Sequence, residues 1–142
     1  MSFDRSRFFS IKPTDVDAVR PWIEPFLVEF AQKTALVAPE DVLQQAKRAD
    51  CQLWSYHDGK TLRCVIATTV NEGVKRKGCL VFICQGTNFL EIADGVIGEL
   101  ESWAKAIGCT HMEIVGRKGW AKVLPSYRAR AVVFEKSFSE TH

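Results

Sequence analysis

The sequence has 142 residues, a formal net charge of +2 and a hydrophobic fraction of 46%. This length suits one domain, whose core can form without disulfide bonds or a structural metal. The near-balanced charge argues against a nucleic-acid partner, and the densest basic run, residues 75–77, falls in a predicted turn. No apolar run is long enough to span a membrane. We therefore expect a single domain over residues 1–142 that binds neither nucleic acid nor membrane.

The cysteines and histidines do not form a recognisable site. There are five cysteines, an odd number, and no two of them have C-x-x-C spacing. Most lie in apolar runs, as buried free thiols do in a reducing compartment. The three histidines lack H-x-x-x-H spacing, so no metal site is expected. The N-terminus is charged and lacks the apolar segment of a signal peptide, and the cytoplasm is the expected location.

A short strand and a helix are expected at the N-terminus. Residues 8–11 are mostly apolar and predict the strand, which Pro13 ends. Thr14 is the expected N-cap of the helix, with Asp17 in the capping-box position. Apolar residues then recur at helical spacing over residues 16–30 and define one buried face.

Prolines shape the next part of the chain. Pro21 and Pro25 lie inside the first helix and predict that it is kinked or divided in two, because each removes a hydrogen-bond donor and crowds the preceding turn. Pro39 opens a second, shorter helix that ends near Lys47, with acidic residues in its first turn.

The middle of the chain is predicted to be antiparallel sheet. Residues 52–56 form a strand, the Asp58-Gly59 pair indicates a hairpin turn, and residues 62–70 form the return strand. A longer turn covers residues 71–78. Residues 79–84 are apolar on both faces, which is typical of a central strand buried on both sides.

The strand at residues 79–84 is followed by a long helix and then by another strand. The helix is indicated by apolar residues at three- and four-residue intervals over residues 93–107, with Asn88 as the expected N-cap and Gly108 as the C-terminal stop. Residues 111–115 form the next strand. This crossover makes it parallel to the strand at 79–84, so the sheet is mixed. A short helix ended by Pro125 and a final strand over residues 131–138 complete the prediction, an α/β fold with helices flanking the sheet.

The element order, and the closing segment in particular, resembles the GNAT superfamily of acetyl-CoA-dependent N-acetyltransferases over nearly the whole chain. The closing residues include Gly116-Arg117, Gly119-Trp120 and Leu124-Pro125-Ser126-Tyr127. They are similar to the small phage-type GNAT-like proteins that carry a G-R-x-G-W segment before the last strand. The resemblance implies a GNAT-like acyl-CoA N-acyltransferase fold, acetyl-CoA as the cofactor, and acetyl transfer to a primary amine by direct attack.

The resemblance also implies where the cofactor binds. In that fold the central strand separates from its parallel neighbour, acetyl-CoA lies in the gap, and its pyrophosphate lies on backbone N–H groups before the long helix. The family sequence there is Gln or Arg, two residues, Gly, one residue, and Gly or Ala; this chain has Asn88 and Leu90 at the two small positions. The implied cofactor-binding residues are Ile83, Cys84, Gln85, Gly86, Thr87, Asn88, Phe89 and Arg117.

Direct attack by an amine requires a base, an oxyanion donor and an acid for the departing thiolate. Glu113, on the strand beside the gap, is the best-placed base, and a simply solvated side chain is the alternative. Tyr127 is the tyrosine nearest to the family's acid position, and it is either that acid or a packing residue with a satisfied hydroxyl. Cys84 is expected to be a buried thiol rather than a nucleophile.

Two functions remain open from the sequence. The first is an N-acetyltransferase whose amine acceptor, a small molecule or a protein, is unidentified. The second is a catalytically inactive protein of the same fold that binds a protein partner, for which the proline-containing first helix offers an apolar surface. A homodimer is compatible with either function.

Overall fold

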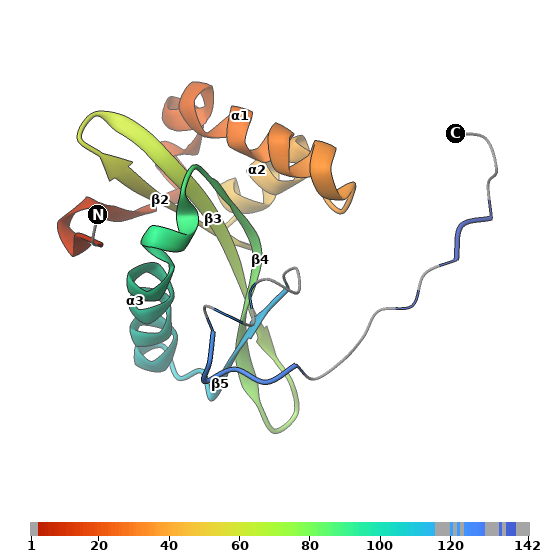
Figure 1. The fold of residues 1–142 in the computed structure, drawn as a ribbon. Helices are drawn as coiled ribbons and strands as arrows, with labels where there is room; N and C mark the ends of the chain where they lie inside the picture. The colour runs from red at the N-terminus through yellow and green to blue at the C-terminus, as the bar shows by residue number, and fades with distance from the viewer. Residues whose placement is uncertain are drawn as a thin grey trace.

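A mixed β-sheet runs through the protein, whose computed structural model describes residues 3–115, 120, 122, 124–129, 134 and 136–138. In these residues the sheet has five strands in the order β1-β2-β3-β4-β5 (Figure 1). Neighbouring strands are antiparallel from β1 to β4, and β4 and β5 are parallel. The strands are β1 (Phe8–Ile11), β2 (Gln52–Asp58), β3 (Thr61–Glu72), β4 (Lys77–Gly86) and β5 (His111–Ile114). The predicted mixed α/β sheet is thus confirmed.

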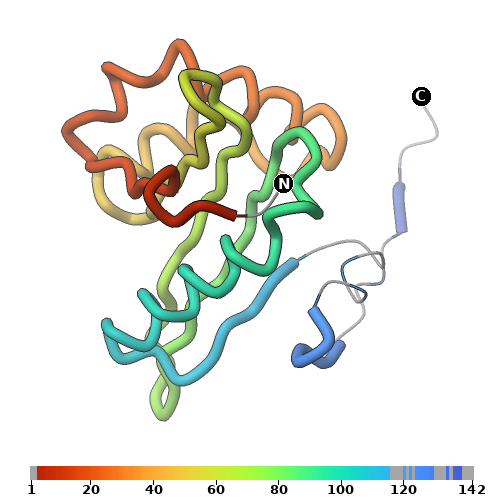
Figure 2. The backbone as a smooth tube through the Cα atoms, turned by 60° about the vertical axis from the view of Figure 1, so that its left-hand side comes forward, coloured from red at the N-terminus to blue at the C-terminus, as the bar shows by residue number. Residues whose placement is uncertain are grey.

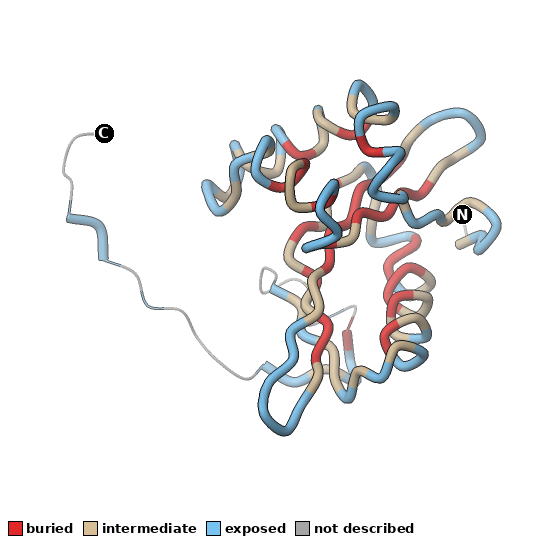
Figure 3. Tube along the Cα trace, turned by 180° about the vertical axis from the view of Figure 1, so that it is seen from behind, coloured by how far each residue is buried: buried red, intermediate tan, exposed pale blue. Residues whose placement is uncertain are grey.

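Helices cover both faces of the sheet. The helices α1 (Val16–Thr34) and α2 (Pro39–Lys47) pack on one face, and α3 (Ala93–Ala106) packs on the other (Figure 1). The strands alternate between the two layers, as the pleat requires. On β2, for example, Leu53 is buried under α1 and α2, whereas Trp54 is buried under α3. Figure 3 shows the buried residues along the strands and on the inward side of α3.

The hairpins extend further than predicted. Gly59 has φ +65° and lies in the short turn between β2 and β3, where a left-handed backbone favours glycine. The second turn is shorter than residues 71–78, because β3 continues to Glu72 and β4 begins at Lys77. β4 also contains a bulge: Ala67 pairs with Ile83 and Thr68 pairs with Val81, so that Phe82 has no opposite residue on β3.

The first helix begins later than predicted and is not divided in two. The expected cap Thr14 lies instead in the 3₁₀ turn η2 (Pro13–Asp15), and α1 begins at Val16 with no side-chain cap bond from Asp15. Pro21 and Pro25 do not divide α1, which is a single helix. Both prolines are exposed, and four residues apart they share one side of the helix. The carbonyl groups that lose their donors therefore face water rather than the core.

The chain reaches α3 through an additional turn that the sequence did not predict. Asn88, with φ 51°, precedes the 3₁₀ turn η3 (Phe89–Glu91), and Ile92 rather than Asn88 is the residue before α3. The predicted stop is confirmed, since Gly108 has φ +92° just after the helix. Figure 2 follows the chain from β4 through α3 into β5, which is the predicted parallel crossover.

The C-terminal predictions fall largely outside the described residues. Of the expected final strand over 131–138, the described residues are Phe134 and residues 136–138, and none of these is in a strand. Phe134 and Phe138 are 92% and 91% exposed. Within the described chain, no helix has the length and apolar character needed to cross a bilayer.

Candidate functional site

The parallel strand β5 pairs with only part of β4. Their register runs from Gly78 opposite His111 to Val81 opposite Ile114, and the amide of Val115 still donates to the Val81 carbonyl at 3.2 Å. β4 then continues to Gly86. Over residues 82–86, the edge of β4 on that side has no strand partner in the described part of the chain. The bulge at Phe82 lies at the same point, directly after Val81, the last residue of β4 that pairs with β5.

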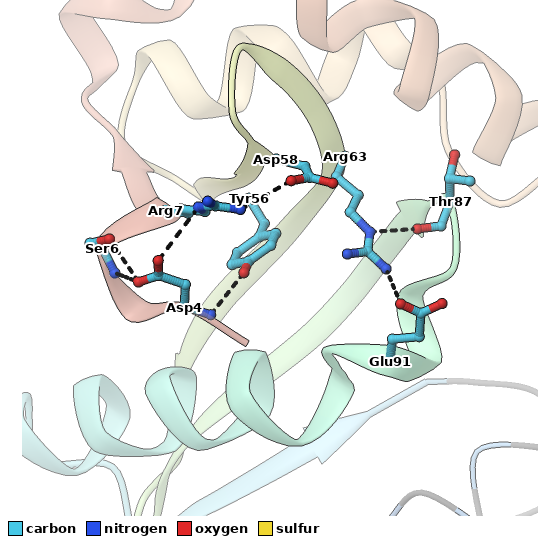
Figure 4. Close-up of polar contacts among 8 residues, drawn as sticks. All are labelled: Asp4, Ser6, Arg7, Tyr56, Asp58, Arg63, Thr87 and Glu91. Carbon is cyan, nitrogen blue, oxygen red and sulfur yellow. Dashed lines mark hydrogen bonds and ion pairs between the residues drawn. The ribbon is translucent and has the colours of Figure 1, made fainter. Parts of the chain in front are cut away.

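The loop at the end of β4 is held by an arginine from β3. The amide of Thr87 donates to the Arg63 carbonyl at 3.1 Å, and Arg63 Nε donates back to the Thr87 carbonyl at 3.1 Å. The other end of the guanidinium donates to the Asn88 carbonyl at 2.8 Å. The same nitrogen donates to the Glu91 carboxylate at 3.1 Å, and Figure 4 shows the contacts of Arg63 with Thr87 and Glu91. The Arg63 side chain is only 8% exposed, and a buried guanidinium needs such acceptors.

The same loop carries backbone donors. Among the described residues, the amides of Asn88, Phe89 and Leu90 have no backbone acceptor. The left-handed backbone of Asn88 is a conformation that asparagine tolerates better than most residues. A pocket of about 360 Å³ lies beside the loop. It is lined by Asp58, Thr61, Leu62, Arg63, Thr87, Asn88 and Glu91. Successive N–H groups next to a concave surface form an anion-binding arrangement.

Gly86, one of the implied cofactor-binding residues, lies where β4 approaches β3 closely. Its backbone has no positive φ, so conformational freedom is not what it supplies. A Cβ atom at this position would lie 2.3 Å from Cβ of Cys64 and 2.5 Å from the carbonyl oxygen of Arg63. Glycine is needed here because β3 and β4 approach closely, and a larger residue would act on strand pairing rather than on bound phosphates.

The residues of β4 before the loop are divided between the two layers. Ile83 is buried under α1 and α2, whereas Cys84 packs toward α3. Gln85 is buried at 8% exposure. Burial raises the pKa of the Cys84 thiol well above its ordinary value, and the neighbouring thiol of Cys64 adds to this. Cys84 is only partly buried, but a thiol that stays protonated is a poor nucleophile, as expected from the sequence.

The remaining predicted cofactor residues lie around the loop or outside the described chain. Phe89 packs against Trp120, with ring centroids 5.5 Å apart. Arg117, together with the rest of residues 116–119, lies outside the described residues. Of the G-R-x-G-W segment, the structure therefore describes Trp120, which packs in the layer under α3.

The structure does not bring the two predicted catalytic residues together. Met112 and Ile114 of β5 pack in the α3 layer, so Glu113 between them points to the opposite face of the sheet. Glu113 is exposed, and its carboxylate lies 3.1 Å from Nε2 of His111. Tyr127, in contrast, packs in the α3 layer.

Tyr127 is tied to α3 by its hydroxyl. This group donates to Oε2 of Glu101 at 2.5 Å. Burial and this hydrogen bond to a carboxylate both raise the pKa of Tyr127 above its ordinary value. The proton thus stays on the Tyr127 oxygen and is directed at Glu101, which fits a packing residue with a satisfied hydroxyl better than a proton donor to a leaving group.

Arg63 is the residue at this site that the sequence reasoning missed. A charged residue inside the apolar, β-branched run over 62–70 was the available signal, because a buried arginine must find several acceptors. In the part of the chain that the structure describes, no cluster of three or more His, Cys, Asp or Glu side chains is arranged to hold a metal ion.

Comparison with solved structures places the fold among acetyltransferases. The crystal structure of a probable acetyltransferase aligns with a TM-score of 0.71 and 10% identity, over 96% of this chain and 99% of that one. An aminoglycoside acetyltransferase from an uncultured soil metagenomic sample, in complex with sisomicin, aligns with a TM-score of 0.69 and 12% identity, over 93% and 95%. A predicted acetyltransferase with acetyl-CoA from Clostridium acetobutylicum aligns with a TM-score of 0.66 and 10% identity, over 95% and 97%.

The likeness is one of structure rather than of sequence. No protein-family model matches the chain, and no curated protein matches it by sequence. The aligned structures nevertheless cover nearly the whole of each partner. The chain therefore has the GNAT acetyltransferase fold predicted from its element order.

Proposed function

We propose that the chain is an N-acetyltransferase that binds acetyl-CoA where β4 extends past β5 and transfers the acetyl group to a primary amine. The end of the β4–β5 pairing at Val81 carries this proposal. Over residues 82–86 the edge of β4 has no strand partner among the described residues, and an extended ligand can add to such an edge as a strand does. The fold is shared with acetyltransferases, one of them solved with acetyl-CoA, although a shared fold alone does not fix an activity.

The loop after β4 supports the position of the diphosphate. The amides of Asn88, Phe89 and Leu90 have no backbone acceptor among the described residues, and they lie just before α3, whose N-terminal end favours negative charge. These three amides would hold the diphosphate, and the edge of β4 would hold the chain that follows it. When bound, acetyl-CoA supplies the thioester that the amine attacks.

Glu113 is the proposed base. Glu113 lies opposite Leu80 on β4, one position before Val81, the last residue of β4 that pairs with β5. Its carboxylate therefore stands near the point where the β4–β5 pairing ends. It is solvent-exposed and lies on a face that an incoming amine can reach. An amine must lose a proton to attack, and a carboxylate next to the reacting centre can accept it. In this proposal Tyr127 supports the α3 layer and does not transfer a proton.

A thermal-shift titration tests the proposal. A ligand that binds only the folded state stabilises it, so acetyl-CoA and CoA at millimolar concentration are expected to raise the melting temperature by a few degrees. A non-nucleotide thioester serves as the control and is expected to have no effect. A flat response to saturating acetyl-CoA would reject the cofactor site and favour the alternative, a protein of this fold that binds a protein partner.

A further inference from the structure

The carbonyl groups that Arg63 binds decide where the loop amides point. In a planar trans peptide the C=O of one residue and the N–H of the next point in opposite directions. The guanidinium holds the carbonyls of Thr87 and Asn88 against β3. The amides of Asn88 and Phe89, which belong to the same two peptide units, are therefore turned away from Arg63. Together with the amide of Leu90, these are the loop amides for which the described residues offer no backbone acceptor.

We propose that Arg63 is the positioning residue of this loop: it fixes the Asn88 and Phe89 amides in the orientation in which they bind the diphosphate of acetyl-CoA. This inference rests on the proposed function. It also accounts for the loop's composition, which has Asn88 and Leu90 where the family has small residues. In this chain, the buried Arg63 side chain from β3 fixes the loop conformation. Flexible glycines that let the backbone adapt to the ligand are then not required.

The contacts of Arg63 make it suited to this role. It hydrogen-bonds the loop through its own carbonyl, and through Nε and one terminal nitrogen of its side chain. The planar fork of a guanidinium restricts several acceptors at once, which a lysine ammonium cannot do in the same geometry. The Glu91 carboxylate joins the same nitrogen at 3.1 Å and links the brace to the last residue of η3. The brace therefore spans the loop from Thr87 to Glu91.

The first experiment compares acetyl-CoA affinity by isothermal titration calorimetry in two variants. Arg63→Gln removes the brace and is expected to weaken binding by about tenfold or more, which corresponds to about 1.4 kcal/mol. Arg20→Gln is the matched control, because Arg20 also binds two partners, Glu24 and Glu40, but joins α1 to α2 far from the loop in sequence. Its affinity is expected to equal that of the wild type. Arg63→Lys keeps the charge and is expected to restore part of the affinity.

The second experiment measures amide hydrogen exchange in the absence of ligand. The amides of Glu91 and Ile92 donate to the carbonyls of Asn88 and Phe89, so they report whether the loop is ordered. In Arg63→Gln both are expected to exchange about tenfold faster or more, and in Arg20→Gln at the wild-type rate. If Arg63→Gln fails to fold, Arg63→Lys carries both measurements, with smaller effects in the same direction.

The outcomes separate this inference from the proposed function. If the wild type does not bind acetyl-CoA, the proposed function fails, and the exchange rates alone decide whether Arg63 holds the loop. If the wild type binds and the Arg63 variants bind equally well, the inference is overturned while the proposed function stands. A loop that exchanges faster without loss of affinity also overturns it, because the oriented amides are then not what binds the diphosphate.

Discussion

The hydroxyl of Tyr127 donates a 2.5 Å hydrogen bond to the carboxylate of Glu101, and so joins the segment after β5 to α3. Tyr127→Phe removes this bond and nothing else of the side chain. We expect the free energy of unfolding to fall by about 1–2 kcal/mol at neutral pH, since hydrogen bonds to charged groups are stronger than neutral ones. Urea denaturation of the two proteins measures the difference, and an equal stability would show that the bond does not form in solution.

The same pair predicts a pH dependence. The pKa of Tyr127 is raised in the folded state, first by burial and then by the bond to Glu101. The folded protein therefore retains this proton where the unfolded chain, with an ordinary tyrosine pKa of about 10, loses it. The stability difference between wild type and Tyr127→Phe should be constant below about pH 10 and shrink as the pH rises further. Buried thiols titrate in both proteins, so their contribution cancels in the difference.

Replacement by alanine should change the stability of the protein in opposite directions at two glycines. Gly86→Ala places a Cβ atom 2.3 Å from Cβ of Cys64, and we expect it to destabilise the protein by about 1–3 kcal/mol through overpacking. Gly98 lies inside α3, where an added Cβ meets no atom within 4 Å. Gly98→Ala should stabilise by about 0.5–1 kcal/mol, because alanine favours the helix. Melting temperatures of the two variants check both signs, and a stable Gly86→Ala would contradict the close strand approach.

Periodicity predicted most of the regular elements of the fold, because hydrophobic spacing follows directly from which face an element buries. The strands of the central hairpins, the helix after Pro39 and the parallel crossover all form where the pattern placed them. The helix starts were less predictable. At Thr14 and at Asn88 the chain inserts a 3₁₀ turn before the helix, and such a turn depends on contacts that no local cap pattern contains.

The candidate site was predictable only in part. The order of a central strand followed by a long helix predicted a cofactor loop around Asn88. Among the described residues, amides of this loop have no backbone acceptor. Arg63, which holds that loop, comes from a strand 24 residues earlier than Thr87. Spacing along the chain cannot show that contact, because it arises from strand pairing between β3 and β4. Likewise, Glu113 and Tyr127 are close in sequence, but the pleat of β5 and the packing under α3 separate them onto different faces.

A charge placed at Leu90 should affect folding and cofactor binding in opposite directions. Leu90 is 68% exposed in η3, so the fold tolerates a polar side chain there. Leu90→Glu adds a negative charge before α3, where the helix dipole favours it, and should raise the stability of the free protein slightly. The same charge repels a diphosphate and should weaken acetyl-CoA binding several-fold, whereas Leu90→Lys should strengthen it.

Calorimetric titration at low and high salt checks these effects of Leu90 variants, because interactions between exposed charges are screened by salt. Leu36→Glu is the control, since Leu36 is equally exposed at 68% but follows α1. Its affinity for acetyl-CoA should not change. If Leu90→Glu and Leu90→Lys bind the cofactor with equal affinity, the diphosphate does not lie at this loop.

Removing the proposed base should separate catalysis from binding. Glu113→Gln keeps the size of the side chain and its exposed position on β5 but can no longer accept a proton. With a primary amine that the wild type acetylates, we expect kcat to fall by about 10²–10⁴-fold. Acetyl-CoA affinity should remain unchanged, because Glu113 lies on β5 and is not part of the loop around Asn88 that is proposed to hold the diphosphate.

The pH profile gives the decisive comparison for Glu113. A base is needed only while the amine is protonated, so the rate of Glu113→Gln should rise toward that of the wild type as the pH approaches the pKa of the free amine, about 10 for a lysine-like acceptor. Glu72→Gln serves as the control, since Glu72 is an exposed carboxylate at the far end of β3 that pairs with Lys77; its profile should match the wild type. A Glu113→Gln enzyme with the wild-type rate at neutral pH would show that Glu113 is simply a solvated residue of β5.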